Sequence, residues 1–164
     1  MVRVIQLIVD NTSGVLSRIS GLFSRRGYNI ESITAGITAD PRYTRITIVT
    51  SGDEAILEQI EKQVGKLIDV RDIRVLEPDD SVYRELVLIK VKVGEEKRQA
   101  LITVCDVFRS KIIDITKDSM IIELTGTQSK INAFIELLQD YEILEIARTG
   151  IAGLRRGSDG VVYL

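Results

Sequence analysis

In the first 77 residues of the chain, hydrophobic and polar positions alternate with the period of a β-strand in some segments and with the period of an α-helix in others. Residues 2–9 and 70–76 are rich in β-branched side chains, and residues 29–38 and 43–50 add two runs that predict a hairpin. Apolar residues at helical spacing predict a helix over residues 14–26, which ends at Gly27. A second helix is expected from Asp53. The two predicted apolar stripes are Val15, Leu16, Ile19, Leu22, Phe23 and Ile56, Leu57, Ile60, Val64, Leu67.

The same order of elements recurs in the second half of the chain. Strands are predicted at 86–93, 111–116, 120–125 and 143–149, with one helix after the first of them and another after the third. The helical stripes are Leu101, Val104, Cys105, Phe108 and Ile131, Phe134, Ile135, Leu138. Each half is therefore predicted to have its strands and helices in the order βαββαβ.

This repetition predicts an α+β protein with two ferredoxin-like βαββαβ sandwiches in tandem. Residues 1–77 form the first expected domain and residues 82–152 the second. Residues 78–81 are the expected linker, because proline and adjacent acids separate two apolar patterns there. Residues 153–164 are glycine-rich and charged, so we expect a mobile or partner-ordered tail.

Composition narrows the function. The chain is 45% hydrophobic and 28% charged, with a net charge of −2. It therefore lacks the excess positive charge that would favour binding to nucleic acid. No apolar run is long enough for a membrane span, and residues 2–9 leave no room for a signal peptide, so we expect a cytoplasmic protein. The small size of each half favours an oligomer.

The chain contains no histidine and a single cysteine, Cys105. The missing histidine removes the commonest general base, the usual catalytic triads and most transition-metal sites. Carboxylates remain available, but Asp53-Glu54 and Asp79-Asp80 fall where a helix start and a linker are expected. We therefore expect no catalytic residue and no metal site.

Residues 10–15 join the first strand to the first helix through a polar loop. A helix N-terminus leaves about four amides without partners and carries partial positive charge, so it can hold an anion. Asn11 offers a side-chain amide, Ser13 is the expected N-cap, and Gly14 leaves the amides of Gly14 and Val15 open. The loop suits one carboxylate, although ordinary helix capping explains the same residues.

One stretch makes a family resemblance specific: NTSGVLSRISGLFSRRGYNIESI resembles the opening of an ACT domain in the small regulatory subunits of acetohydroxyacid synthase, also called acetolactate synthase. The resemblance extends through GDEAILEQIEKQVGKLIDV, RELVLIKV, FRSKIIDIT, ELTGTQSKINAF and EIARTGIAGLRRG. It therefore covers almost the whole chain.

The resemblance implies that ACT domains of two chains pair into a homodimer and bind valine at their interface. Asn11 and Gly14 match the positions on the carboxylate side. Asn29 and Ile30 match those contributed by the neighbouring chain, and Gly36 matches a position associated with valine sensitivity. In the second domain, Val93-Gly94-Glu95-Glu96 places carboxylates at the equivalent loop, so no second valine site is expected.

The resemblance also implies a noncatalytic role in valine, leucine and isoleucine biosynthesis. This chain would stimulate a large catalytic subunit and mediate feedback inhibition, while thiamine diphosphate, magnesium and FAD would belong to that large subunit. Two alternatives stay open. A free-standing ACT-type transcriptional regulator is disfavoured by the acidic composition, and a carboxylate-based enzyme by the lack of a suitably spaced acidic pair.

Overall fold

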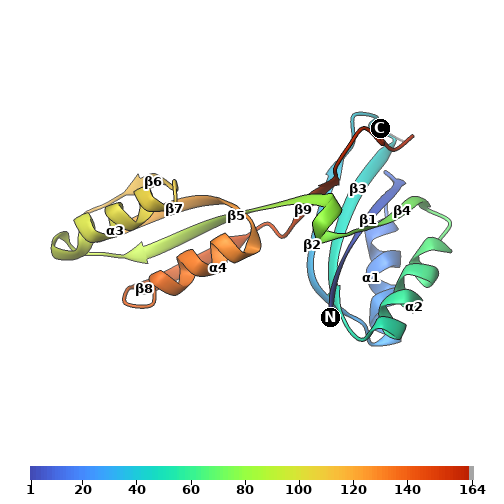
Figure 1. Ribbon diagram of the computed structural model, residues 1–164, viewed down its shortest axis with the longest axis horizontal. Helices are drawn as coiled ribbons and strands as arrows, with labels where there is room; N and C mark the ends of the chain where they lie inside the picture. The colour runs from blue at the N-terminus through green and yellow to red at the C-terminus, as the bar shows by residue number, and fades with distance from the viewer. Residues whose placement is uncertain (163–164) are drawn as a thin grey trace. The chain divides into compact units, whose positions relative to one another are not determined.

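The computed structural model describes residues 1–162 of the 164-residue chain. The chain folds into two compact units (Figure 1). Unit 1 contains Met1–Tyr83 and the C-terminal residues from Ile151 onward, and unit 2 contains Arg84–Gly150. The chain therefore leaves unit 1 once and returns to it.

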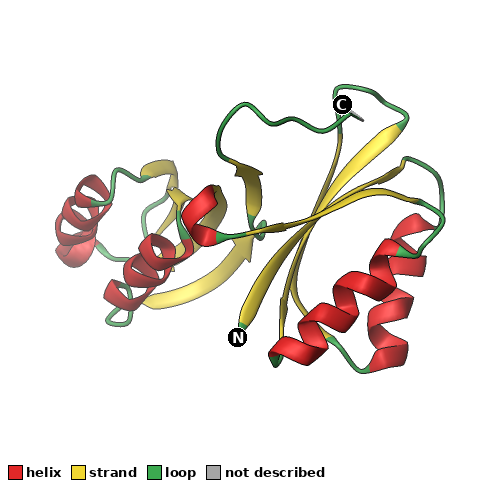
Figure 2. Ribbon diagram, turned by 45° about the vertical axis from the view of Figure 1, so that its right-hand side comes forward, coloured by secondary structure: helices red, strands yellow, loops and turns green. Residues whose placement is uncertain are grey.

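Unit 1 is an antiparallel sheet with two helices on one face (Figure 2). Its strands lie in the order β2-β3-β1-β4, so β2 and β4 are the edges. The elements are β1 (Val2–Asp10), α1 (Val15–Arg26), β2 (Asn29–Ile37), β3 (Tyr43–Ser51), α2 (Glu54–Gly65) and β4 (Val70–Leu76). This is the βαββαβ order that the hydrophobic pattern predicts.

The core of unit 1 forms where the helical stripes meet alternate residues of β1 and β3. Ile5, Leu7 and Val9 of β1 are at most 1% exposed and pack against both helices. Two predicted core residues are corrected. Leu16 is 48% exposed and Ile56 is 39% exposed, because each lies at the margin of its helical stripe rather than over the sheet. The apolar stripe of α1 is therefore narrower than predicted.

Unit 2 repeats the architecture with its own sheet and core. The sheet order is β6-β7-β5-β8, again antiparallel, and the buried stripes of two helices cover one face. The elements are β5 (Ser81–Lys92), α3 (Glu95–Val107), β6 (Lys111–Ile115), β7 (Ser119–Gly126), α4 (Gln128–Leu137) and β8 (Glu142–Arg148). Cys105 is 1% exposed within this core, as the helical pattern predicts.

The structure divides the chain differently from the predicted boundaries. Pro78–Asp80 forms one turn of 3₁₀ helix (η1), and β5 begins at Ser81, inside unit 1. A further strand, β9 (Ala152–Arg155), pairs with β5 where a tail was expected. Ile151 is 3% exposed against Val4, Val49 and Leu76, so burial of apolar surface orders this segment.

Polar contacts hold the C-terminal segment in unit 1 as well. Arg155 Nε donates to Asp80 Oδ2 at 2.5 Å, and Arg74 Nη2 donates to the Gly160 carbonyl at 3.0 Å. A Cβ on Gly153 would lie 2.9 Å from Leu76 Cδ1 and 3.0 Å from Tyr83 Cδ1, so a larger residue would have to displace these side chains. The prediction of a tail from residue 153 is corrected for residues 153–155, which belong to β9, whereas residues 156–162 form no helix or strand. Residues 163 and 164 lie outside the described part.

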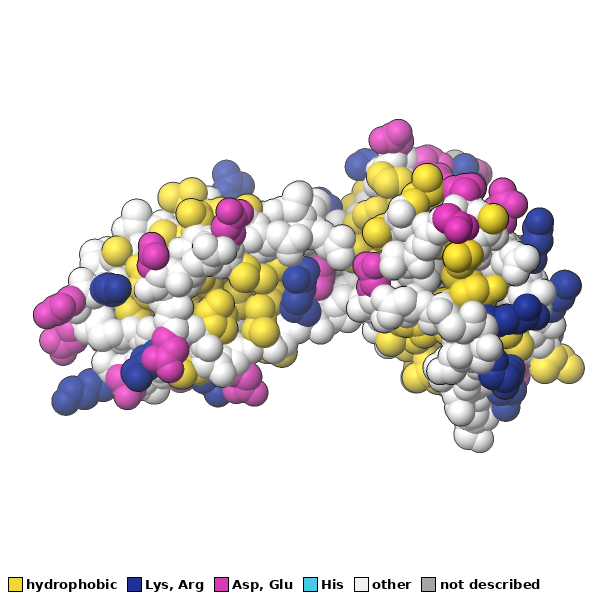
Figure 3. Space-filling model, turned by 90° about the horizontal axis from the view of Figure 1, so that it is seen from below, with side chains coloured by type: hydrophobic (Ala, Val, Ile, Leu, Met, Phe, Trp, Pro, Cys, Tyr) yellow, Lys and Arg dark blue, Asp and Glu magenta, His cyan; other side chains and the backbone are white. Residues whose placement is uncertain are grey.

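The surface carries both signs of charge. Acidic and basic side chains both occur on the visible face of each unit, with apolar side chains between them (Figure 3). Among residues 1–162, no helix is both long and apolar enough to cross a membrane.

Candidate functional site

The loop between β1 and α1 is fastened to the β2–β3 turn by Asn11. The Asn11 backbone N–H donates to the Arg42 carbonyl at 2.8 Å, and its Nδ2 donates to the Pro41 carbonyl at 2.8 Å. Thr44 Oγ1 donates to Asn11 Oδ1 at 3.1 Å. Both ends of the side-chain amide are thus engaged, and Asn11 fixes the shape of the loop.

Gly14, rather than the predicted Ser13, is the N-cap of α1. Gly14 has φ +85°, in the left-handed region, and no side chain caps the helix. Glycine is favoured there because a Cβ makes that conformation costly. With no capping side chain and no acid in the first turn, the first amides of α1 remain available to an anion. The expected role of Ser13 is therefore wrong, whereas the open helix end is present.

A cation that the sequence analysis missed lies beside this loop. Arg18 Nε and Nη2 donate to Asp69 Oδ2 and Oδ1 at 2.6 and 3.0 Å. A Cβ placed on Gly14 would lie 3.0 Å from Arg18 Nη1. The hydrogen bonds from Arg18 lower the pKa of the Asp69 carboxyl, and the same pairing raises the pKa of Arg18. The spacing of four from Gly14 could have suggested Arg18, but Asp69 is distant in sequence.

A second ion pair neutralises the acid at the start of the loop. Arg71 Nε and Nη2 donate to Asp10 Oδ1 and Oδ2 at 2.7 and 2.6 Å. The Asp10 backbone N–H also donates to the Asp69 carbonyl at 3.0 Å. These contacts tie the end of β1 to the residues that begin β4.

The remaining predicted site residues lie along β2. Gly36 pairs with Arg45 and has open space where a side chain would be, and it lies at the end of β2 that faces the turn held by Asn11. Asn29 and Ile30 begin the same strand at the opposite end of the sheet, paired with Ser51 and Thr50. At about 3.3 Å per residue, the two ends of β2 are roughly 26 Å apart.

One chain therefore does not bring all the predicted site residues together. Asn11, Ser13, Gly14 and Val15 form the loop and helix start, and Gly36 lies on β2 at the same end of the sheet. Asn29 and Ile30 are separated from them by the length of β2. The Asn29 carbonyl accepts a hydrogen bond from Thr50 Oγ1 at 2.6 Å, and Ile30 packs partly against the core.

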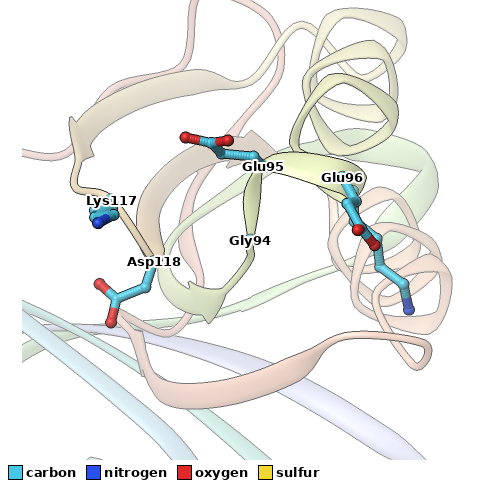
Figure 4. Close-up of a pocket in the computed structure, with 6 residues that line it drawn as sticks. Gly94, Glu95, Glu96, Lys117 and Asp118 are labelled. Atoms are coloured by element: carbon cyan, nitrogen blue, oxygen red, sulfur yellow. The ribbon is translucent and has the colours of Figure 1, made fainter.

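The equivalent helix start in unit 2 has different chemistry. Gly94, the N-cap of α3, has an extended conformation with φ −83°, and Glu95 and Glu96 occupy the first turn. These acids line an open hollow together with Lys117 and Asp118 of the β6–β7 hairpin (Figure 4). The described residues contain no cluster of acidic or cysteine side chains that could hold a metal ion. At the helix start itself, Glu95 and Glu96 already occupy the positive end of α3, where a ligand carboxylate would meet two like charges.

Each half of the chain matches the model of a known protein family. Residues 5–72 match the model described as an acetohydroxyacid synthase small subunit-like ACT domain. Residues 84–157 match the model described as the small subunit of acetolactate synthase. Together the two matches cover most of the chain.

Similar proteins of known name match over nearly the full length. A probable acetolactate synthase small subunit of Methanothermobacter thermautotrophicus is 46% identical over 95% of this chain and 94% of its own. The small subunit of acetolactate synthase isozyme 3 of Escherichia coli is 44% identical over 96% and 97%. The crystal structure of the small subunit from Thermotoga maritima has a TM-score of 0.89 and 40% identity, over 97% and 99%.

Proposed function

The chain belongs to the family of acetolactate synthase small subunits, and on that premise we propose that it is the noncatalytic regulatory subunit of an acetolactate synthase. In this proposal it stimulates a large catalytic subunit in the cytoplasm and makes it sensitive to valine. Thiamine diphosphate, magnesium and FAD are bound by the large subunit. The chain thereby regulates valine, leucine and isoleucine biosynthesis.

The position of the site residues along the β2 edge is the observation that carries this proposal. β2 has an unpaired edge, and such an edge is suited to pairing with another chain. If two copies pair antiparallel about Ile33, the middle residue of β2, then Asn29 of one copy lies opposite Ile37 of the other. The loop at Gly14 would then approach Asn29 and Ile30 of the second copy, and a twofold axis would create two such sites.

The chemistry of the combined site fits a small amino acid. The first amides of α1 can receive the carboxylate. The Asn29 carbonyl already accepts one hydrogen bond, but it has a second lone pair for an ammonium group. Ile30 supplies an apolar wall, and burial of an isopropyl group contributes about 1.5–3 kcal/mol. Leu16, which is 48% exposed on α1, would gain cover in such a dimer.

Regulation requires that valine bind one state of the holoenzyme more tightly than another. A coupling free energy of about 1–3 kcal/mol changes the equilibrium constant between the active and inactive states by roughly five- to 150-fold. Such coupling needs no catalytic group in the small subunit. Unit 2 has acids at its corresponding helix start, so we place valine in unit 1 only.

Reconstitution with the large subunit tests this function. The purified chain alone should form no acetolactate, whereas its addition to the large subunit should raise the rate and introduce inhibition by valine. Calorimetry should give one valine per chain, and sedimentation should give a dimer. Turnover by the isolated chain, or a rate that it leaves unchanged, would contradict the proposed role.

A further inference from the structure

Arg18 presents one edge of its guanidinium group to the loop at Gly14. Asp69 binds the Nε and Nη2 edge through two hydrogen bonds of 2.6 and 3.0 Å. Among the described residues no acceptor is bound to Nη1, which lies 3.0 Å from the position that a Gly14 Cβ would occupy. The side chain of Asp69 is only 12% exposed, so the anchor is well packed, while that of Arg18 is 48% exposed.

Arg18 is the cation of this loop that is free to meet a ligand. The other two arginines near the loop are held by acids: Arg71 Nε and Nη2 donate to the Asp10 carboxylate, and Arg42 Nε and Nη2 donate to that of Asp40. An anion that binds the first amides of α1 would lie beside Gly14 and hence beside Arg18 Nη1. A charge-assisted hydrogen bond from a guanidinium to a carboxylate is stronger than a hydrogen bond between neutral groups.

Unit 2 has an arginine at the same distance in sequence from the glycine that precedes its first helix. Arg98 follows Gly94 by four residues, as Arg18 follows Gly14. Arg98 Nη2 donates to the backbone carbonyls of Thr116 and Lys117 at 2.9 and 2.6 Å. Arg98 is therefore used to hold the β6–β7 hairpin, whereas Arg18 is clamped by an acid with one edge turned toward the loop.

We propose that Arg18 is a further effector-binding residue, which donates from Nη1 to the carboxylate of the amino acid, and that Asp69 is the positioning residue that holds it there. This inference rests on the proposed function, because it concerns the same site. Its consequence is a preference for ligands with a carboxylate over otherwise identical ligands with an uncharged amide.

Calorimetry on the dimer with L-valine and L-valinamide tests the inference. The unmodified chain should bind valine at least about tenfold more tightly than valinamide. Arg18→Gln should weaken valine binding by about tenfold and change valinamide binding by less than about twofold, which removes the preference. Arg98→Gln is the matched control and should leave both affinities unchanged. Far-UV circular dichroism and sedimentation of both variants should match those of the unmodified dimer, which shows that they are folded.

The outcomes separate this inference from the proposed function. If the unmodified chain binds valine but Arg18→Gln retains the full preference, Arg18 is not a ligand residue and the valine site stands. An equal loss for valine and valinamide also overturns the inference, since it indicates a structural role. If Arg18→Gln does not fold, Asp69→Asn replaces it and should reduce the preference about threefold; an unchanged preference would overturn the role of the pair. If the unmodified chain binds no valine, the proposed function itself fails.

Discussion

The start of α1 in unit 1 and the start of α3 in unit 2 occupy the same place in the repeated βαββαβ order. In both, a glycine precedes the helix and an arginine follows four residues later. Gly14 is left-handed and no acid follows it in the first turn, whereas Gly94 is extended and is followed by Glu95 and Glu96. The first turn of α1 therefore leaves its amides open to an anion, whereas the first turn of α3 already carries two carboxylates, although both helices have the same backbone dipole.

If valine binds at the start of α1 as proposed, this difference explains why the duplicated fold holds one effector site and not two. The helix dipole, which is common to both units, contributes only about 0.3–1 kcal/mol for a neighbouring charge. The side chains in the first turn decide its use: in unit 2 the glutamates already occupy the positive end of the dipole. Four changes test this contrast, and the first three assume the proposed valine site.

Leu16→Glu should have the largest effect, because it gives α1 an acid in its first turn, as α3 has. Leu16 is 48% exposed, so the change opens no core, and a glutamate near a helix N-terminus does not destabilise the helix. Repulsion should weaken valine binding by more than about tenfold, or about 1.4 kcal/mol. Calorimetry measures this, and Leu16→Gln controls for the lost apolar contact. Equal losses in the two variants would exclude repulsion as the cause.

Asn11→Ala should weaken valine inhibition about three- to tenfold and leave stimulation of the large subunit largely intact. The change removes two side-chain hydrogen bonds, each contributing about 0.5–1.5 kcal/mol, that hold the loop on the β2–β3 turn. Inhibition curves of the reconstituted enzyme measure the effect. Thr44→Val removes only the bond to Asn11 Oδ1 and should produce a smaller shift. Unchanged inhibition in Asn11→Ala would argue against a site at this loop.

The paired change Glu95→Gln and Glu96→Gln should affect stability and not valine binding. Each lost charge at the start of α3 should lower the free energy of unfolding by about 0.3–1 kcal/mol, because the carboxylates interact favourably with the helix dipole. Urea denaturation measures the stability, and calorimetry the affinity. A change in valine affinity beyond about twofold would place a valine site in unit 2 and undo the contrast.

The Arg18–Asp69 pair should produce the smallest effect, a pH-dependent one. Its hydrogen bonds lower the folded pKa of Asp69, so the stabilisation is fully present above the unfolded pKa, which is about 4, and is lost as the pH falls through the folded value. The stability difference between the unmodified chain and Asp69→Asn should therefore shrink as the pH is lowered from neutral toward about 3. Urea titrations at several pH values measure it. A difference that grows in acid would contradict this sign.

Most of the fold could be predicted because each element carries its own signal. Gly27 and the two arginines before it mark the end of α1, and the repeated helical and strand patterns give βαββαβ twice. The roles of single residues were harder to predict than the elements. Ser13 is an ordinary capping residue, but the left-handed turn at Gly14 makes Gly14 the N-cap. Leu16 fits the helical period and is still 48% exposed, because it lies at the margin of the apolar stripe formed by Val15, Ile19, Leu22 and Phe23.

The candidate site was predicted only in part. Asn11, Gly14 and Val15 do form a loop and an open helix end, but Asn11 binds the β2–β3 turn through both ends of its amide. The segment after Ile151 was expected to be a tail because glycines and charges dominate it. Its single buried isoleucine and its pairing with β5 involve partners far away in the chain, which no local pattern reveals.

The sequence by itself determined the α+β class, the duplicated order of elements and the family, because periodicity, helix-ending residues and extended motifs are local properties of the chain. Only the tertiary structure decided that Arg18 is clamped by Asp69 beside Gly14, and that Asn29 lies at the far end of the sheet from Asn11. The physical reason is that charge pairing and sheet register act between residues separated by tens of positions. These long-range contacts place Arg18 beside the open start of α1 and separate Asn29 and Ile30 from it by the length of β2.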